Sequence, residues 1–189
     1  MVSKRLIPAL MAAALAAFPA SAETCDMSGM ADLVEPEKRA EVLQAVREAG
    51  NAEEARMRSN AMWDIWATAP DAHAQQLLDE GMDRRDVRDF AGAIKAFDAL
   101  VAYCPGYAEG YNQRAFIRFM QQDYAPALTD LDAAIARAPD HYAAIAGKAL
   151  TLMGLGRNGE AKTALEQALE FNPWLPERGL MDMLKNQDI

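Results

Sequence analysis

Apolar residues recur along the chain with two periods, one helical and one much longer. Runs with helical spacing, such as Phe97 and Val101, predict amphipathic helices that each bury one stripe. These runs return every 34 residues when residues 74–107, 108–141 and 142–175 are aligned. A fixed period of this length indicates a stack of similar units, because each unit buries its apolar face against its neighbours.

The three units share side-chain size at five aligned positions. In order, these are a bulky residue, a small residue four positions later, a second small residue, a large or aromatic residue and a proline. Small residues where two helices touch let their axes approach closely, and a proline ends the second helix. Each unit is therefore predicted to be a helical hairpin. The fifteen residues are Leu77, Gly81, Ala93, Phe97, Pro105, Tyr111, Ala115, Ala127, Leu131, Pro139, Ile145, Ala149, Ala161, Leu165 and Pro173.

Aspartates stand in front of the apolar runs. Asp71 and Asp140 precede first helices of the units, and Asp89 and Asp123 precede second helices. A carboxylate in this position accepts hydrogen bonds from free backbone N–H groups. All four are therefore predicted to cap helices.

Two further helices are predicted upstream, over Glu37–Gly50 and Glu53–Thr68. The second carries Trp63 and Trp66, and Trp63 lies one 34-residue step before Phe97. Terminal units of repeat stacks are atypical. This hairpin is therefore expected to be a degenerate unit that caps the stack at its N-terminal end.

The N-terminus has the pattern of an export signal. Lys4 and Arg5 form a positive start, residues 6–18 an apolar middle and residues 20–22 a small-residue cleavage site. The apolar part is shorter than the roughly 20 residues that span a bilayer. The chain is expected to be exported to the bacterial periplasm without spanning the membrane.

These features divide the chain into five parts. A short closing helix is expected from Pro176 to Lys185, with Trp174 packed beneath it. The predicted parts are a signal peptide over 1–22, a tail over 23–35, the capping hairpin over 36–73, three repeats over 74–175 and a C-terminal capping helix over 176–189.

The repeated residues resemble the tetratricopeptide repeat of exported bacterial proteins. The resemblance implies an all-α, right-handed superhelical solenoid without catalytic activity. It implies that the first helices line a concave groove, which binds a partner protein or peptide in an adaptor or chaperone-like role. The implied groove residues are Leu78, Met82, Arg85, Asn112, Phe116, Phe119, Ala146, Leu150 and Met153.

Two interpretations of this groove stay open. Its Phe and Met side chains suit an apolar peptide or an amphipathic helix. Alternatively, the N-terminal segment or the closing helix covers the stripe, and the chain is a structural or bracing subunit of an envelope assembly. Family members of this kind assist cytochrome maturation or envelope assembly, and the resemblance does not choose between them.

One branch of the family clamps acidic C-terminal peptides with basic and amide side chains on the first helices. The corresponding positions here include Leu78, Met82 and Gly147, so that clamp is missing. Arg114 and Arg118, one helical turn apart, can hold a carboxylate or cover apolar packing.

The charge balance narrows the classes of molecule that are expected to bind this chain. The chain has 28 acidic and 19 basic residues and a formal net charge of −9. Nucleic acids and anionic membranes attract positive surfaces. Both are therefore excluded as expected partners.

Few residues are candidates for catalysis, metal binding or disulfide formation. Cys25 and Cys104 either form a disulfide, as an oxidising compartment favours, or remain a free tail thiol and a buried small side chain. His73 and His141 occupy equivalent repeat positions in turns and are expected to be solvated. The chain lacks the sequence motifs of serine nucleophiles, phosphate loops, zinc proteases and dinucleotide sites. No catalytic residue, metal or cofactor is therefore predicted.

Overall fold

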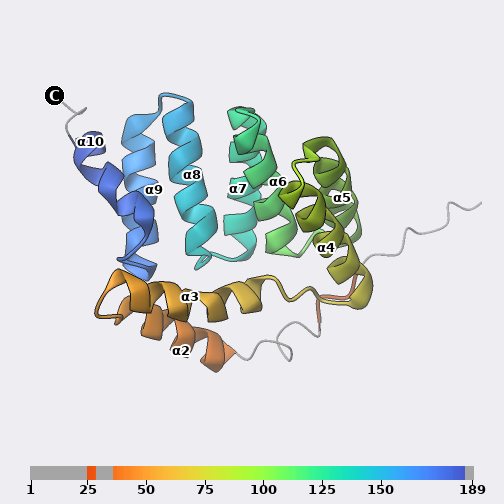
Figure 1. Cartoon of the computed structure of the whole chain (residues 1–189), viewed down its shortest axis with the longest axis horizontal. Helices are drawn as coiled ribbons and strands as arrows, with labels where there is room; N and C mark the ends of the chain where they lie inside the picture. The colour runs from red at the N-terminus through yellow and green to blue at the C-terminus, as the bar shows by residue number, and fades with distance from the viewer. Residues whose placement is uncertain (1–24, 29–35, 186–189) are drawn as a thin grey trace, which may run out of the picture.

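Helices provide all the regular secondary structure in the described part of the chain, residues 25–28 and 36–185 of a computed structural model. The helices α4–α9 stand side by side in a row, and α2 and α3 run along this row beneath the lower ends of its helices (Figure 1). The expected signal peptide, most of the tail and the last four residues lie outside the described residues. The helices are α2 Pro36–Arg47, α3 Ala52–Trp66, α4 Ala72–Asp86, α5 Phe90–Tyr103, α6 Ala108–Met120, α7 Tyr124–Arg137, α8 Tyr142–Gly154, α9 Asn158–Phe171, the 3₁₀ helix η1 Pro176–Leu180 and α10 Met181–Lys185.

The predicted solenoid is confirmed. Each 34-residue unit is a helix pair, α4 with α5, α6 with α7 and α8 with α9. In the first pair Phe97 is fully buried against Gly81, where an added Cβ would lie 2.2 Å from the Phe97 ring. The small residue lets the two helices approach closely, as the aligned columns predict.

The predicted capping bonds form at two of the four aspartates, Asp71 and Asp89. Oδ1 of Asp71 accepts the backbone N–H of Ala74 at 2.8 Å, and Oδ1 of Asp89 accepts that of Gly92 at 3.0 Å. Asp123 occupies the cap position of α7, although its side chain makes no capping bond.

The prediction for Asp140 is wrong. His141 caps α8, because its Nδ1 accepts the backbone N–H of Ala144 at 3.2 Å. Asp140 lies one residue earlier and accepts the Nε–H of Arg39 from α2 at 2.7 Å. A contact with a distant helix therefore replaces the local cap.

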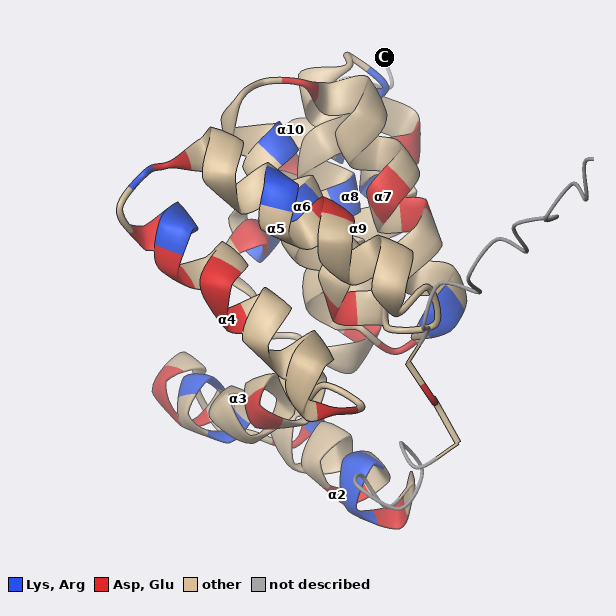
Figure 2. Ribbon diagram, turned by 90° about the vertical axis from the view of Figure 1, so that its right-hand side faces the viewer, with Lys and Arg blue, Asp and Glu red and all other residues tan. Residues whose placement is uncertain are grey.

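The α2–α3 hairpin forms as expected but does not extend the row beyond α4. Instead it lies under the ends of the repeat helices (Figure 2). Val46 and Met62 are fully buried in a cluster that also contains Ile145 of α8 and Ala168 of α9. The hairpin was expected to cap the N-terminal end of the stack, next to the first repeat. The apolar faces of α2 and α3 instead pack on the third repeat, so this expected position is corrected.

The C-terminal segment closes the stack in two short helices rather than one. Leu184 of α10 packs with Leu152 and Leu165 of the third repeat. Trp174 lies just before η1, and its Nε1–H donates to the carbonyl of Ala49 at 2.9 Å. The α2–α3 hairpin and the C-terminal segment therefore meet at the third repeat.

Candidate functional site

A cavity of about 620 Å³ opens on the inner face of the repeats. We call it the concave pocket. Residues of α3, α6, α8 and the segment 172–177 make up most of its lining, and α4 and α7 add one residue each, Arg85 and Leu131. Its apolar lining includes Trp63, Ala143, Ala146, Leu150, Phe116, Phe119 and Trp174.

Two aromatic side chains from different parts of the chain remain accessible in this lining. Phe116 of α6 is 46% exposed and Trp63 of α3 is 39% exposed. The guanidinium carbon of Arg85 lies 6.0 Å from the Phe116 ring centroid. Accessible aromatic surface within a recess is typical of sites that bind another molecule.

Six of the nine expected groove residues line the concave pocket. They are Arg85, Asn112, Phe116, Phe119, Ala146 and Leu150. The structure brings these residues of three different repeats to one recess.

The other three do not line this cavity, and the assignment of Leu78 is corrected. Leu78 is 0% exposed and belongs to the core of the first repeat, which also contains Ala69 from the segment after α3. Met82 packs against that same cluster, and Met153 packs against the core of the third repeat. Neighbouring side chains therefore bury Leu78 fully and Met82 and Met153 in part.

Sequence reasoning missed the residues that the non-repeating segments add to the site. Trp63 and Arg56 come from α3, and Trp174 and Glu177 follow α9, the last repeat helix. The only signal in the sequence is the presence of tryptophans outside the repeat pattern. The 34-residue period carries no information on where such segments dock.

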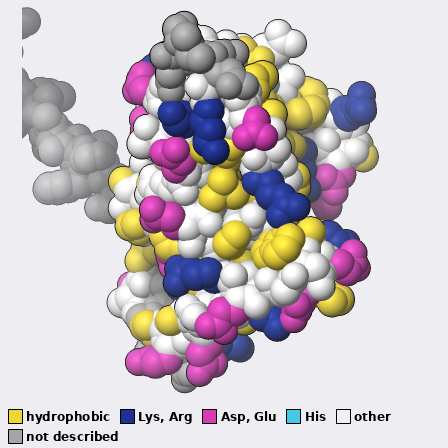
Figure 3. Space-filling view, turned by 90° about the vertical axis from the view of Figure 1, so that its left-hand side faces the viewer, with side chains coloured by type: hydrophobic (Ala, Val, Ile, Leu, Met, Phe, Trp, Pro, Cys, Tyr) yellow, Lys and Arg dark blue, Asp and Glu magenta, His cyan; other side chains and the backbone are white. Residues whose placement is uncertain are grey.

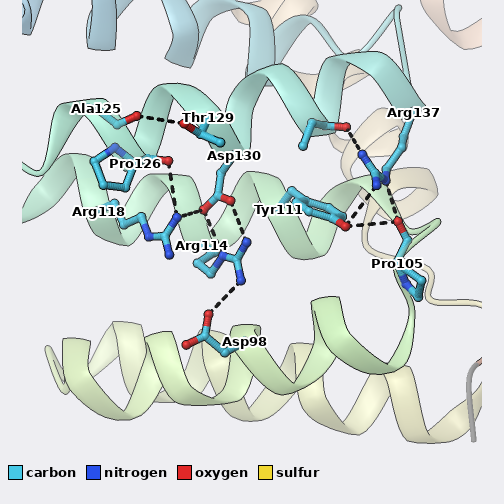
Figure 4. Close-up of polar contacts among 11 residues, drawn as sticks. Asp98, Pro105, Tyr111, Arg114, Arg118, Ala125, Pro126, Thr129, Asp130 and Arg137 are labelled. Atoms are coloured by element: carbon cyan, nitrogen blue, oxygen red, sulfur yellow. Dashed lines mark hydrogen bonds and ion pairs between the residues drawn. The ribbon is translucent and has the colours of Figure 1, made fainter. Parts of the chain in front are cut away.

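Arg114 and Arg118 hold a carboxylate of the chain itself. Both guanidinium groups bond the buried side chain of Asp130, at 2.6 and 2.9 Å from Arg114 and 2.7 Å from Arg118 (Figure 4). Arg114 also contacts Asp98 at 2.7 Å. Burial lowers the pKa of Arg114, but these carboxylates outweigh burial and raise it. The two arginines therefore join α6 to α7 within the second repeat, and Arg114 alone also links this repeat to α5 of the first.

The expectation that His141 is solvated is wrong. Its ring is fully buried and stacks on Trp66 with centroids 3.8 Å apart. Because Nδ1 accepts the backbone N–H of Ala144, Nε2 carries the hydrogen that is donated to Glu109 at 2.8 Å. Glu109 is also buried, so the histidine joins α3, α6 and α8. His73, at the equivalent repeat position, is exposed.

A disulfide joins Cys25 to Cys104 at the end of α5. The backbone N–H of Cys25 also donates to the carbonyl of Tyr103 at 2.9 Å. Sδ of Met27 lies 3.5 Å from Sγ of Cys104. The described part of the tail is therefore fixed to the first repeat.

Neither a metal cluster nor a membrane span is found in the part of the chain that the structure describes. Its His, Cys, Asp and Glu side chains form no group of three or more suited to a metal ion. None of its helices is long and apolar enough to cross a bilayer.

On the end of the molecule near α10, hydrophobic side chains alternate with basic and acidic ones (Figure 3).

Comparison with known proteins agrees with this geometry. Residues 118–174 match the family model of the tetratricopeptide repeat. A tetratricopeptide-repeat protein of Rhizobium etli is 30% identical over 81 residues, which cover 43% of this chain and 40% of that protein. The tetratricopeptide repeat protein 36 homolog of Nematostella vectensis is 36% identical over 67 residues, which cover 35% of this chain and 37% of that protein. The matches thus span about two fifths of the length of these curated relatives.

Solved tetratricopeptide-repeat structures share the fold. The first such domain of Spaghetti (RPAP3), bound to an HSP90 peptide, superposes with a TM-score of 0.60 at 21% identity. The match covers 61% of this chain and 92% of that one.

Proposed function

We propose that this chain binds a segment of a partner protein in the concave pocket, as an adaptor or chaperone-like module. The observation that carries the proposal is the accessible aromatic surface of Phe116 and Trp63 inside a recess of about 620 Å³. Phe116 lies on a first helix of the repeats, and such helices support peptide binding in domains of this fold. Leu150 and Phe119 extend the apolar contact area.

The proposal places the protein in the periplasm. Residues 1–22 have the composition of an export signal. The disulfide between Cys25 and Cys104 suits an oxidising compartment. In this proposal the protein acts by binding and performs no catalysis.

A second candidate function rests on a specific observation. Trp63 of α3 and Trp174 near the C-terminus belong to the lining, so the chain covers part of its own inner face. A bracing subunit of an envelope assembly would have such a pocket and would not exchange peptides through it.

Photocrosslinking in the native envelope distinguishes the two functions. A photo-reactive residue at Phe116 is compared with one at Val87, which is 76% exposed in a turn outside the pocket lining. We expect Phe116, and not Val87, to label a separate protein identified by mass spectrometry. Labelling that stays within the chain itself would favour the bracing subunit and contradict peptide binding.

A further inference from the structure

A buried polar atom without a partner lies in the lining of the concave pocket. Oε2 of Glu177 is buried and makes no hydrogen bond with any described residue. The hydroxyl of Tyr142, which also belongs to the lining, lies within hydrogen-bonding reach of the Ser59 and Asn172 side chains. Since buried polar atoms are normally paired, the Glu177 oxygen indicates that a ligand supplies the missing bond.

The charges in the lining are unequally balanced. Arg56 already pairs with Glu53 at 3.0 Å. Arg85 pairs with Asp86 at 2.8 Å and donates to Oε1 of Gln113 at 2.9 Å. The carboxylate of Glu177 forms no ion pair with any described residue, so the charge left without a counterpart in the lining is negative.

The position of Glu177 is fixed by its neighbours. The backbone N–H of Trp174 donates to Oδ1 of Asn172 at 3.0 Å, and the Trp174 ring is held to the α2–α3 turn through Ala49. The guanidinium of Arg178 lies over the Trp174 ring at 4.8 Å. Glu177 therefore lies in a segment whose Trp174 ring contacts both the α2–α3 turn and Arg178.

We propose that the concave pocket recognises a lysine or arginine side chain carried within an apolar segment of the partner. This proposal rests on the peptide-binding function given above. The cation pairs with the Glu177 carboxylate in a charge-assisted hydrogen bond. The flanking apolar residues of the segment pack on Phe116 and Leu150.

The charge of the whole chain acts in the same direction. Its formal net charge of −9 attracts a basic segment over distances longer than a hydrogen bond and disfavours acidic ones. This preference is opposite to that of a clamp for acidic peptide ends, for which the required basic residues are absent.

Selection from a random peptide library tests the proposal without assuming a partner. A display library of random dodecapeptides is panned on the purified protein, and the selected peptides are synthesised with blocked ends. We expect an apolar consensus with one conserved lysine or arginine. Replacing that residue by norleucine should weaken binding about tenfold or more in fluorescence anisotropy, because the buried Oε2 of Glu177 is then left without a partner.

Matched protein variants locate the effect. Glu177→Gln keeps the shape of the side chain and should weaken the selected peptide about tenfold or more, while Glu166→Gln on the exposed surface of α9 should leave binding unchanged. The norleucine peptide should bind Glu177→Gln at least as tightly as it binds the wild type, because the variant has no unpaired carboxylate. Circular dichroism confirms that each variant is folded.

The outcomes separate this inference from the proposed function. Peptides that are weakened by Phe116→Ala but carry no basic residue, or that ignore Glu177→Gln, would overturn the charge preference and leave peptide binding intact. If the library yields no peptide, or if Phe116→Ala has no effect on those selected, both proposals fail.

Discussion

The repeat stack α4–α9 and the α2–α3 hairpin are both built from paired helices, yet different contacts hold them. In the stack, each helix packs on its sequence neighbours through equivalent residues, as Phe97 packs on Gly81. The hairpin packs on α8 and α9, about a hundred residues away along the chain, through contacts that occur once, such as Arg39 with Asp140. Repetition therefore defines the stack, whereas individual long-range contacts define the shape of the concave pocket.

The largest expected effect compares one buried side chain from each region. Phe97→Ala should lower the free energy of unfolding by about 3–5 kcal/mol, because it leaves a cavity between α4 and α5. Met62→Ala should cost about 2–5 kcal/mol but act first on the hairpin. Chemical unfolding is followed by far-UV circular dichroism, which reports all helices, and by the fluorescence of the three tryptophans, which lie in α3 and beside the α2–α3 turn.

The order of the fluorescence and dichroism transitions shows whether the hairpin and the stack unfold separately. In Met62→Ala the fluorescence transition should precede the dichroism transition, and in Phe97→Ala the two should coincide. Coincidence in both variants would mean that the hairpin and the stack unfold as one cooperative unit. Val87→Ala, at an exposed turn, serves as a control with a change within about 0.5 kcal/mol.

The disulfide tests how strongly the tail restrains the hairpin. Cys25 and Cys104 are 79 residues apart in sequence, and the loop between them contains the whole of α2 and α3. Cys25→Ser should lower the free energy of unfolding by about 2–4 kcal/mol, because the unfolded chain loses a restraint. Reductant should shift the melting temperature of the wild type to that of Cys25→Ser and should not change the variant. A reduced wild type that melts as before would show that the link does not restrain folding.

Substitution of the buried His141 tests the contact between the α2–α3 hairpin and the repeat stack. His141→Ala removes a hydrogen bond to Glu109 and the stacking on Trp66, and it should cost about 1–3 kcal/mol in thermal unfolding. His73→Ala, at the equivalent but exposed repeat position, should change stability by less than about 0.5 kcal/mol. Equal losses of stability in His141→Ala and His73→Ala would contradict the role of His141 in joining the hairpin to the stack.

The difference between these two histidines shows what the sequence could predict. The period and the sizes of Gly81 and Phe97 predict the helix pairs, because those contacts are local and repeated. The burial of His141 depends on Trp66, which comes from a segment outside the period. Repeat register likewise placed Phe116 in the concave pocket but misplaced Leu78, since only the observed path of the chain after α3 shows what covers it.

The smallest expected effect compares the helix caps of the two regions. Asp71 begins the stack and Asn51 begins α3, and each accepts a backbone N–H, from Ala74 at 2.8 Å and Glu54 at 2.9 Å. The bond from Ala74 lowers the pKa of Asp71 below its ordinary value of 3.8, with a smaller contribution from the Tyr103 hydroxyl. The amide of Asn51 does not titrate.

A carboxyl whose pKa is lower in the folded state contributes stability above its unfolded pKa and loses that contribution as pH falls through the folded pKa. The wild type should therefore be more stable than Asp71→Asn at neutral pH, and the difference should shrink below about pH 4. Thermal unfolding of both proteins between pH 7 and pH 3 measures this difference. Asn51→Ala should instead cost about 0.5–2 kcal/mol at every pH in that range, because it removes a cap without removing a charge. A wild-type advantage over Asp71→Asn that stays constant on acidification would show that the carboxylate charge of Asp71 does not stabilise the first helix of the stack.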